Sequence, residues 1–206
     1  MITLHHLTVS RSTRIIWLLE ELELPYNLVT HERGPDLRAP ASLKAVHPLG
    51  KAPVIEDDGL ILAESGAIIE HIVSTHGGGR LAPPPGTAEH AKWREWLHYA
   101  EGSAMMPILT TLFGNRTGLT EGMRAFITPE VDAHLGFVAK TVTGSGYLLD
   151  GFSSADIQMS YVVQAAQMAG LLEPRPALSD YLARLEARPA FAKSITIGGP
   201  VALPSR

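Results

Sequence analysis

The order of apolar and polar positions predicts that the first part of the chain alternates strands with helices. Residues 2–7 are mostly apolar or β-branched and contain no Gly or Pro, which is typical of a strand. From Ser12 onward, apolar residues recur at helical spacing until Pro25, and residues 26–31 alternate again as a second strand. This order predicts a βαβ unit, in which the two strands are parallel.

A second pattern predicts an antiparallel hairpin followed by a helix. Residues 53–56 (Pro-Val-Ile-Glu) and 60–62 (Leu-Ile-Leu) lie on either side of the turn sequence Asp-Asp-Gly at residues 57–59. A helix then begins near Glu64, and the three glycines at residues 77–79 end it.

Beyond these elements the sequence pattern changes from alternating strands and helices to a linker followed by helices. Residues 80–86, Arg-Leu-Ala-Pro-Pro-Pro-Gly, favour an extended linker at a domain boundary. The pattern is then helical nearly throughout, with helices expected at residues 87–113, 120–143, 154–169 and 177–188. Ser153 and Asp156 predict a reciprocal capping arrangement at the third of these helices. We therefore expect an α+β protein: an α/β domain over residues 1–79, a linker over 80–86 and an all-α domain over 87–206.

The amino-acid composition excludes several classes of site and partner. With 45% hydrophobic and 18% charged residues among 206, the chain has enough apolar side chains for a sizeable core. A net charge of −4 and the absence of a Lys/Arg run make nucleic acid a poor partner. The absence of Cys excludes disulfides, thiolate metal sites and any sulfur nucleophile supplied by the protein. Without a signal-like or membrane-spanning apolar segment, we expect a cytoplasmic protein that does not enter membranes.

Several common sites are absent from the sequence. It contains no P-loop, no dinucleotide fingerprint, no His-Glu-x-x-His and no Gly-x-Ser-x-Gly. The nine histidines are scattered, and the adjacent His5 and His6 would point to opposite faces of a strand. We therefore expect no metal site.

The segment after the first strand offers hydroxyl groups at the start of a helix. Ser10 and Ser12 lie where the first strand leads into the first helix. A helix N-terminus favours a negative charge by about 0.3–1 kcal/mol, and a hydroxyl there can donate a hydrogen bond to a thiolate. Plain N-capping by either serine is the alternative interpretation.

A second candidate group surrounds Pro53. A proline that opens a strand is a candidate for a cis peptide bond, which would expose neighbouring backbone groups to a peptide-like ligand. Glu64 and Ser65, at the start of the next predicted helix, could hold an ammonium group and a carboxylate of such a ligand.

These motifs, in this order, resemble those of the glutathione transferases. The resemblance covers nearly the whole chain and rests on Ser10-x-x-x-Arg14, Pro48-x-Gly50-Lys51-x-Pro53, Glu64-Ser65, Ser153-x-x-Asp156 and Arg188-Pro189-x-Phe191. The nearest likeness is to bacterial and fungal members whose first helix begins Ser-Arg-Ser-x-Arg-Ile-x-Trp. It implies a thioredoxin-like N-terminal domain followed by an all-α helical-bundle domain.

The resemblance also implies roles for individual residues. The sulfur of glutathione would be hydrogen-bonded by Ser10, with Ser12 as the alternative. The rest of glutathione would be held by Lys51 near the glycyl carboxylate, Ala52 before a cis Pro53 along the cysteinyl backbone, and Glu64 with Ser65 around the γ-glutamyl group. His47 departs from the pattern, since many relatives have Asn there. No Tyr lies at the end of the first strand, so the tyrosine-dependent classes are not the model.

The function implied is conjugation of the glutathione thiolate to small apolar electrophiles in detoxification. Glutathione would be a co-substrate, no cofactor would be tightly bound, and the protein would be a homodimer. The all-α domain would supply the electrophile pocket, for which Met105, Met106 and Phe113 are candidates, although core packing is the commoner role of such side chains. The alternatives are a glutathione-dependent isomerase or peroxidase and a non-catalytic binding protein.

Overall fold

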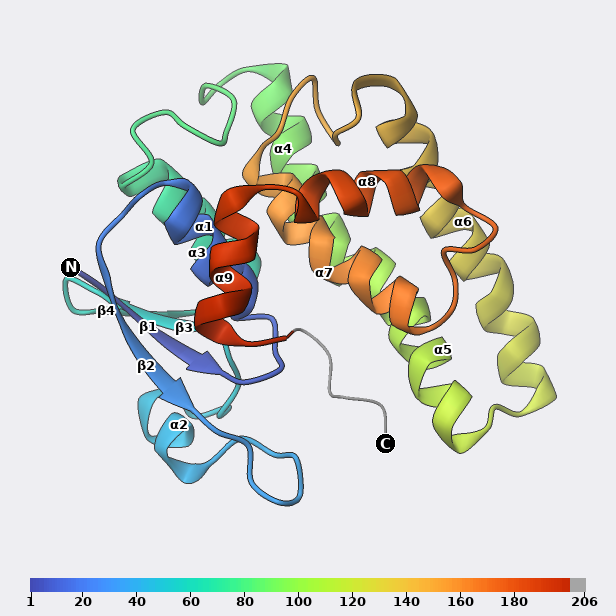
Figure 1. Ribbon diagram of the computed structural model, residues 1–206, viewed down its shortest axis with the longest axis horizontal. Helices are drawn as coiled ribbons and strands as arrows, with labels where there is room; N and C mark the ends of the chain where they lie inside the picture. The colour runs from blue at the N-terminus through green and yellow to red at the C-terminus, as the bar shows by residue number, and fades with distance from the viewer. Residues whose placement is uncertain (201–206) are drawn as a thin grey trace. The chain divides into compact units, whose positions relative to one another are not determined.

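In the computed structural model, which describes residues 1–200, the first part of the chain forms a four-stranded sheet with the order β2-β1-β3-β4 (Figure 1). The strands are β1 (Ile2–Leu7), β2 (Tyr26–His31), β3 (Val54–Asp57) and β4 (Leu60–Ala63). β1 pairs with β2 in parallel, whereas β3 is antiparallel to both β1 and β4. The predicted parallel pair and the predicted hairpin are both confirmed.

Helices cover both faces of this sheet. They are α1 (Thr13–Glu21), α2 (Ala41–Val46), α3 (Ser65–Thr75) and α9 (Pro189–Gly198). Figure 1 shows α1, α3 and α9 on one side of the sheet and α2 on the other. Side chains alternate along β1, so Leu4 and His6 share the face on which His6 bonds to Gly198 of α9, while Leu7 points the other way and packs with Leu43 of α2. The short α2 lies in a stretch for which the sequence pattern predicted no element.

The C-terminal helix belongs to the unit built around the sheet. Residues 187–200 group with residues 1–80, whereas residues 81–186 form the second unit, so the structure divides the chain differently from the expected boundaries. Phe191 of α9 packs edge-on against Trp17 of α1, with the ring centroids 5.1 Å apart. Arg188 also forms a bidentate ion pair with Glu21, in which Nε and Nη2 lie 2.6 and 2.9 Å from the two carboxylate oxygens. Residues 201–206 of the expected all-α domain lie outside the described residues.

The second unit is all-helical in its described residues 81–186. Its elements are α4 (Ala88–Tyr99), the π-helical turn η1 (Ala100–Ala104), α5 (Met105–Thr117), α6 (Glu121–Ser145), α7 (Ser154–Met168) and α8 (Pro176–Glu186). α7 contacts α4, α5 and α8, and most of its residues are buried. Together the two units have the α+β organisation expected: a thioredoxin-like domain and a helical-bundle domain. None of the helices in the described part of the chain is long and apolar enough to cross a membrane.

The start of α7 is held by a buried carboxylate. Asp156 is fully buried and accepts hydrogen bonds from the backbone N–H groups of Ser153 and Leu148, at 2.8 and 3.0 Å. It also accepts a hydrogen bond from the Tyr181 hydroxyl of α8, at 2.9 Å. The predicted reciprocal capping by Ser153 and Asp156 is present. One side chain thus joins the preceding loop, the first turn of α7 and α8.

We expect Asp156→Ala to lower the free energy of unfolding by about 3–5 kcal/mol, because it leaves several buried donors without an acceptor. The melting temperature should fall by about 6–20 °C. Differential scanning calorimetry measures this change. Asp150→Ala, which removes an exposed carboxylate nearby, is the control, and equal melting temperatures for the two variants would contradict the role of Asp156.

Candidate functional site

The register of the sheet brings three segments of the first unit to one edge, the one formed by the ends of β1 and β4 and the start of β3. Val54, the first residue of β3, pairs with His5 on one side and with Ala63 on the other. The end of β1, the start of β3 and the end of β4 therefore lie side by side. The side chains of Ala52 and Ala63 pack against a buried cluster that contains Leu7 and Val54. The segments that carry Ser10, Pro53 and Glu64 thus begin or end at the same edge.

Ser10 and Ser12 lie in one hydrogen-bonded group after β1. Their hydroxyl oxygens are 2.7 Å apart. Ser12 is fully buried, and its Oγ lies 2.8 Å from Nδ1 of His6 and accepts a hydrogen bond from the Leu7 N–H at 3.2 Å. Ser12 makes no capping hydrogen bond to α1, so the N-cap interpretation is wrong for this residue. Ser10 retains 7% exposure, and its hydroxyl donates to the Leu7 carbonyl at 2.8 Å.

The protonation of His6 determines where the Ser12 proton goes. Nε2 of His6 lies 2.9 Å from the Gly198 carbonyl, which can only accept, so Nε2 carries the proton. Burial lowers the pKa of His6 from its usual 6.5, an effect that the bond to Gly198 opposes, so the ring is neutral at pH 7. Nδ1 is then an acceptor, and the Ser12 hydroxyl donates to it. The Ser12 hydroxyl therefore donates its proton to a buried acceptor and not toward the surface.

The start of α3 presents a strained acidic residue. Glu64 is exposed, precedes the first residue of α3 and has a positive φ of 71°, a conformation that non-glycine residues seldom adopt. Such strain is concentrated at ligand sites in known proteins. The next residue, Ser65, is buried and accepts a hydrogen bond from Nη2 of Arg14 at 2.7 Å. The buried Arg14 of α1 thereby fixes the first turn of α3.

The segment before β3 carries the other expected binding residues. The Ala52–Pro53 peptide bond is cis, as expected for a proline that opens a strand. Lys51 is exposed, and Gly50 before it has a φ of 58°, in the left-handed region that suits glycine. The regular strand begins at Val54, so Ala52 precedes the paired part of β3.

One residue that positions this site has no motif in the sequence to mark it. Arg33 follows β2 and donates hydrogen bonds to the carbonyls of Thr8 and Val9, at 3.0 and 2.8 Å. Val9 has a φ of 52°, which is rare for a β-branched residue, and Arg33 holds this segment in place just before Ser10. Arg33 lies in a polar stretch without periodicity, so no sequence signal linked it to Ser10.

The candidate pocket residues of the second unit have different environments. Met105 is buried in the core, whereas Met106 and Phe113 of α5 are 52% and 58% exposed. Met106 and Phe113 are seven residues apart and therefore lie on one face of the helix. The core-packing alternative holds for Met105 only.

Comparisons with known proteins agree with this architecture. Residues 4–80 match the family model of the glutathione S-transferase N-terminal domain. The chain is 35% identical to glutathione S-transferase 3 of Schizosaccharomyces pombe, over 81% of this chain and 75% of that protein. It is 31% identical to glutathione S-transferase 1 of Saccharomyces cerevisiae, over 94% of each. The chain belongs to the glutathione S-transferase family.

Structural comparison supports the same family. A crystal structure of a glutathione S-transferase from Actinobacillus pleuropneumoniae has a TM-score of 0.87 and 32% identity, and the match covers 96% of this chain and 93% of that one. As a member of the glutathione S-transferase family, the protein is a transferase enzyme. Ser10, Pro53 and Glu64 all lie within the family-model match.

The lowered pKa of His6 gives stability a defined pH dependence. Between the folded-state pKa and about 6.5, the unfolded chain binds more protons than the folded one, so stability falls as the pH drops below about 6.5. The slope contributed by one group is at most about 1.4 kcal/mol per pH unit. Denaturant unfolding between pH 7 and pH 5 measures it.

We expect His6→Gln to flatten this slope, because Gln keeps a donor for Gly198 and does not titrate. An unchanged slope in His6→Gln would show that His6 is not a source of the pH dependence.

Proposed function

We propose that this protein conjugates the thiolate of glutathione to small apolar electrophiles, with Ser10 as the hydrogen-bond partner of the sulfur. Family membership supports glutathione transfer in general. The observation that carries the assignment of Ser10 is the hydrogen-bond arrangement of Ser10, Ser12 and His6. Glutathione is a co-substrate in this proposal, and no tightly bound cofactor is required.

The two serines differ in what their hydroxyl groups can still do. The proton of Ser12 is held by His6, and the side chain is fully buried, so Ser12 has neither a proton nor a surface to offer a ligand. The Ser10 hydroxyl has the Leu7 carbonyl and the Ser12 oxygen as acceptors, and the residue, although buried, keeps 7% exposure where Ser12 has none. Its proton can turn from these acceptors to an incoming anion. This supports Ser10 over Ser12.

A hydrogen bond from Ser10 would lower the pKa of the bound thiol. Free thiols have a pKa near 8.5, and the thiolate is the reactive nucleophile. A hydrogen bond to a charged acceptor contributes about 1.5–3 kcal/mol, and each pKa unit corresponds to about 1.4 kcal/mol. A shift of about one to two units follows. It is enough to ionise much of the bound thiol at neutral pH, after which the reaction needs an electrophile held near the sulfur.

The remaining groups at the sheet edge suit the rest of the tripeptide. The exposed Glu64 carboxylate could pair with the ammonium of the γ-glutamyl group. The N-terminus of α3, which begins at Ser65, favours the carboxylate of that same γ-glutamyl group. Lys51 is an exposed cation for the glycyl carboxylate, and the backbone of Ala52 lies beside the first paired residue of β3 for the cysteinyl unit.

The second substrate is proposed from the apolar surface of the helical unit. Met106 and Phe113 are exposed apolar side chains on one face of α5, and a flexible thioether suits varied apolar ligands. A role in detoxification, a cytoplasmic location and a homodimeric assembly accompany this proposal. They rest on the family resemblance.

The assignment of the serine can be tested by titrating the bound thiol. We expect glutathione bound to the wild-type protein to show a thiolate absorbance with a pKa about one to two units below the free value. Ser10→Ala should move this pKa back toward the free value and lower kcat more than it changes the affinity for glutathione. Ultraviolet difference spectra against pH, with rates for an apolar aryl halide, provide both measurements.

Ser12→Ala is the matched control, and it should leave the thiol pKa within a few tenths of a unit of the wild type. A thiol pKa restored by Ser12→Ala alone would transfer the role to Ser12. Binding with an unshifted thiol pKa would favour a non-catalytic binding protein. A shifted pKa with isomerase or peroxidase turnover and no conjugation would favour those activities instead.

The proposed role of Glu64 predicts a loss of affinity. We expect Glu64→Gln to weaken glutathione binding about tenfold or more, because the ammonium group loses a charged partner. Isothermal titration calorimetry measures the dissociation constant. Glu89→Gln, which removes an exposed carboxylate from the first turn of α4, should bind glutathione as the wild type does. Equal affinity for both variants would remove Glu64 from the site.

A further inference from the structure

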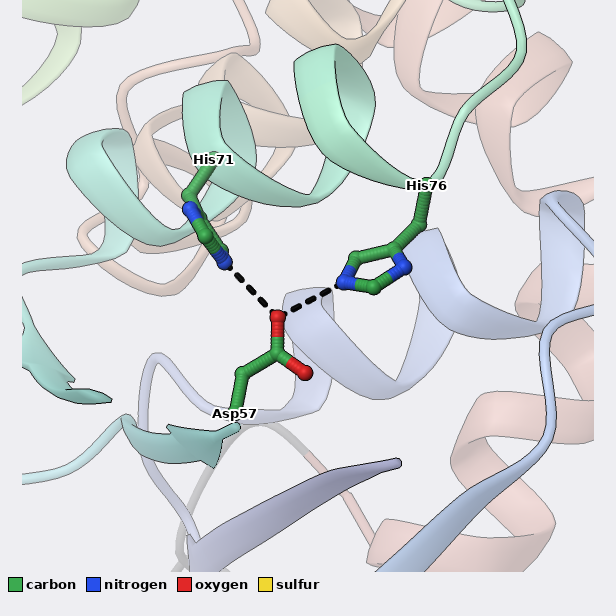
Figure 2. Close-up of side chains that lie close together, drawn as sticks. All are labelled: Asp57, His71 and His76. Atoms are coloured by element: carbon green, nitrogen blue, oxygen red, sulfur yellow. Dashed lines mark hydrogen bonds and ion pairs between the residues drawn. The ribbon is translucent and has the colours of Figure 1, made fainter. Parts of the chain in front are cut away.

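A group of three metal-ligand side chains lies between the end of β3 and the C-terminal end of α3 (Figure 2). Asp57 is the last residue of β3, His71 lies on α3, and His76 directly follows that helix. Nε2 of His71 and Nε2 of His76 are 2.8 and 2.6 Å from the same carboxylate oxygen, Oδ2 of Asp57. The cluster is separate from Ser10 and Glu64 in the proposed function, and the inference drawn from it does not depend on that function.

The backbone fixes the two histidines where they converge. The His76 N–H donates to the Ile72 carbonyl at 2.8 Å, so His76 remains attached to the last turn of α3. The chain then turns at Gly77, where a Cβ atom would lie 2.4 Å from the Val73 carbonyl oxygen. Only glycine fits this turn. The position of His76 is thus set by local packing, independently of any ligand.

The carboxylate of Asp57 is incompletely satisfied. Asp57 is 5% exposed, and Oδ2 accepts from both imidazoles, whereas the buried Oδ1 has no hydrogen-bond partner among residues 1–200. The two imidazoles hold the Asp57 side chain between the end of β3 and the end of α3. A buried negative charge with an unpaired oxygen favours a cation beside it.

The geometry matches the ligand set of a transition-metal ion. One ligand atom from each of Asp57, His71 and His76 lies within 4.8 Å of the other two. Zn²⁺ binds imidazole nitrogen at about 2.0–2.1 Å and carboxylate oxygen at about 2.0–2.2 Å, usually with four ligands. Small movements of the side chains would place an ion between the three atoms. The histidine side chains are 23% and 28% exposed, which leaves a path for the ion and room for water as the fourth ligand.

We propose that Asp57, His71 and His76 form a binding site for a divalent transition-metal ion of the Zn²⁺ class. The two imidazoles exclude Mg²⁺ and Ca²⁺ as the natural occupants, since these ions take oxygen ligands. When the ion binds, each imidazole presents the lone pair of Nε2 and carries its proton on Nδ1, and the carboxylate turns one oxygen to the metal. The ion joins the end of β3 to the end of α3 and stabilises the first unit.

The proposed metal site can be tested with the 206-residue chain after a chelator has removed any bound metal, in the absence of glutathione. We expect the wild type to bind about one Zn²⁺ at this site, measured by isothermal titration calorimetry. At a free Zn²⁺ concentration one hundred times the dissociation constant, the melting temperature should rise by about 5–10 °C. His76→Gln and Asp57→Asn should weaken binding at least tenfold and abolish this rise.

The choice of Gln separates metal binding from hydrogen bonding. The side-chain amide of Gln can donate to Asp57 as the imidazole N–H does, but its nitrogen does not bind Zn²⁺. His76→Gln should therefore melt close to the wild type without zinc, and His98→Gln should keep full zinc binding. A wild type that binds no Zn²⁺ would reduce the cluster to a hydrogen-bond network. Zinc binding that persists unchanged in both His76→Gln and Asp57→Asn would place the ion elsewhere, and either result overturns the proposal.

Discussion

The pairing of Val54 with both His5 and Ala63 is the constraint on which the rest of the first unit depends. Because β3 is antiparallel to both neighbours, its start lies beside the ends of β1 and β4. Three chain segments that are distant in sequence therefore meet at one edge. A slip of one residue would turn the side chains of β3 to the opposite faces. Val54 would then leave the cluster that it shares with Leu7 and Leu43. The apolar interior of the sheet thus fixes the register, and the register fixes the site.

Most of the fold follows from local patterns in the sequence. The parallel pair, the hairpin and the cap formed by Ser153 and Asp156 were predicted because each depends on residues close together in the chain. The last helix was missed because Pro189 resembles a stop signal after the helix before it. In the structure Pro189 is the first residue of α9, where a missing N–H has no consequence. Its placement on α1 depends on contacts such as Phe191 with Trp17, which span most of the chain.

The candidate site was only partly predictable for a related reason. The segments that carry Ser10 and Glu64 could be found from motifs, but the motifs left Ser10 and Ser12 as alternatives. The difference between them comes from His6, whose protonated nitrogen is set by the carbonyl of Gly198, 192 residues away. No local pattern encodes that bond. Likewise, His71 and His76 are five residues apart, a spacing that does not place two side chains on one face of a continuous helix. They converge because α3 ends between them.

The two proposed sites lie at opposite ends of the same two elements. β3 follows Pro53 and ends at Asp57, and α3 begins at Ser65 and ends just before His76. An ion at the far end would join this strand and this helix without touching glutathione. Stability is not uniform within a protein, and the ends of helices open first. Tying the end of α3 to β3 would reduce such opening along the helix whose first turn is held by Arg14.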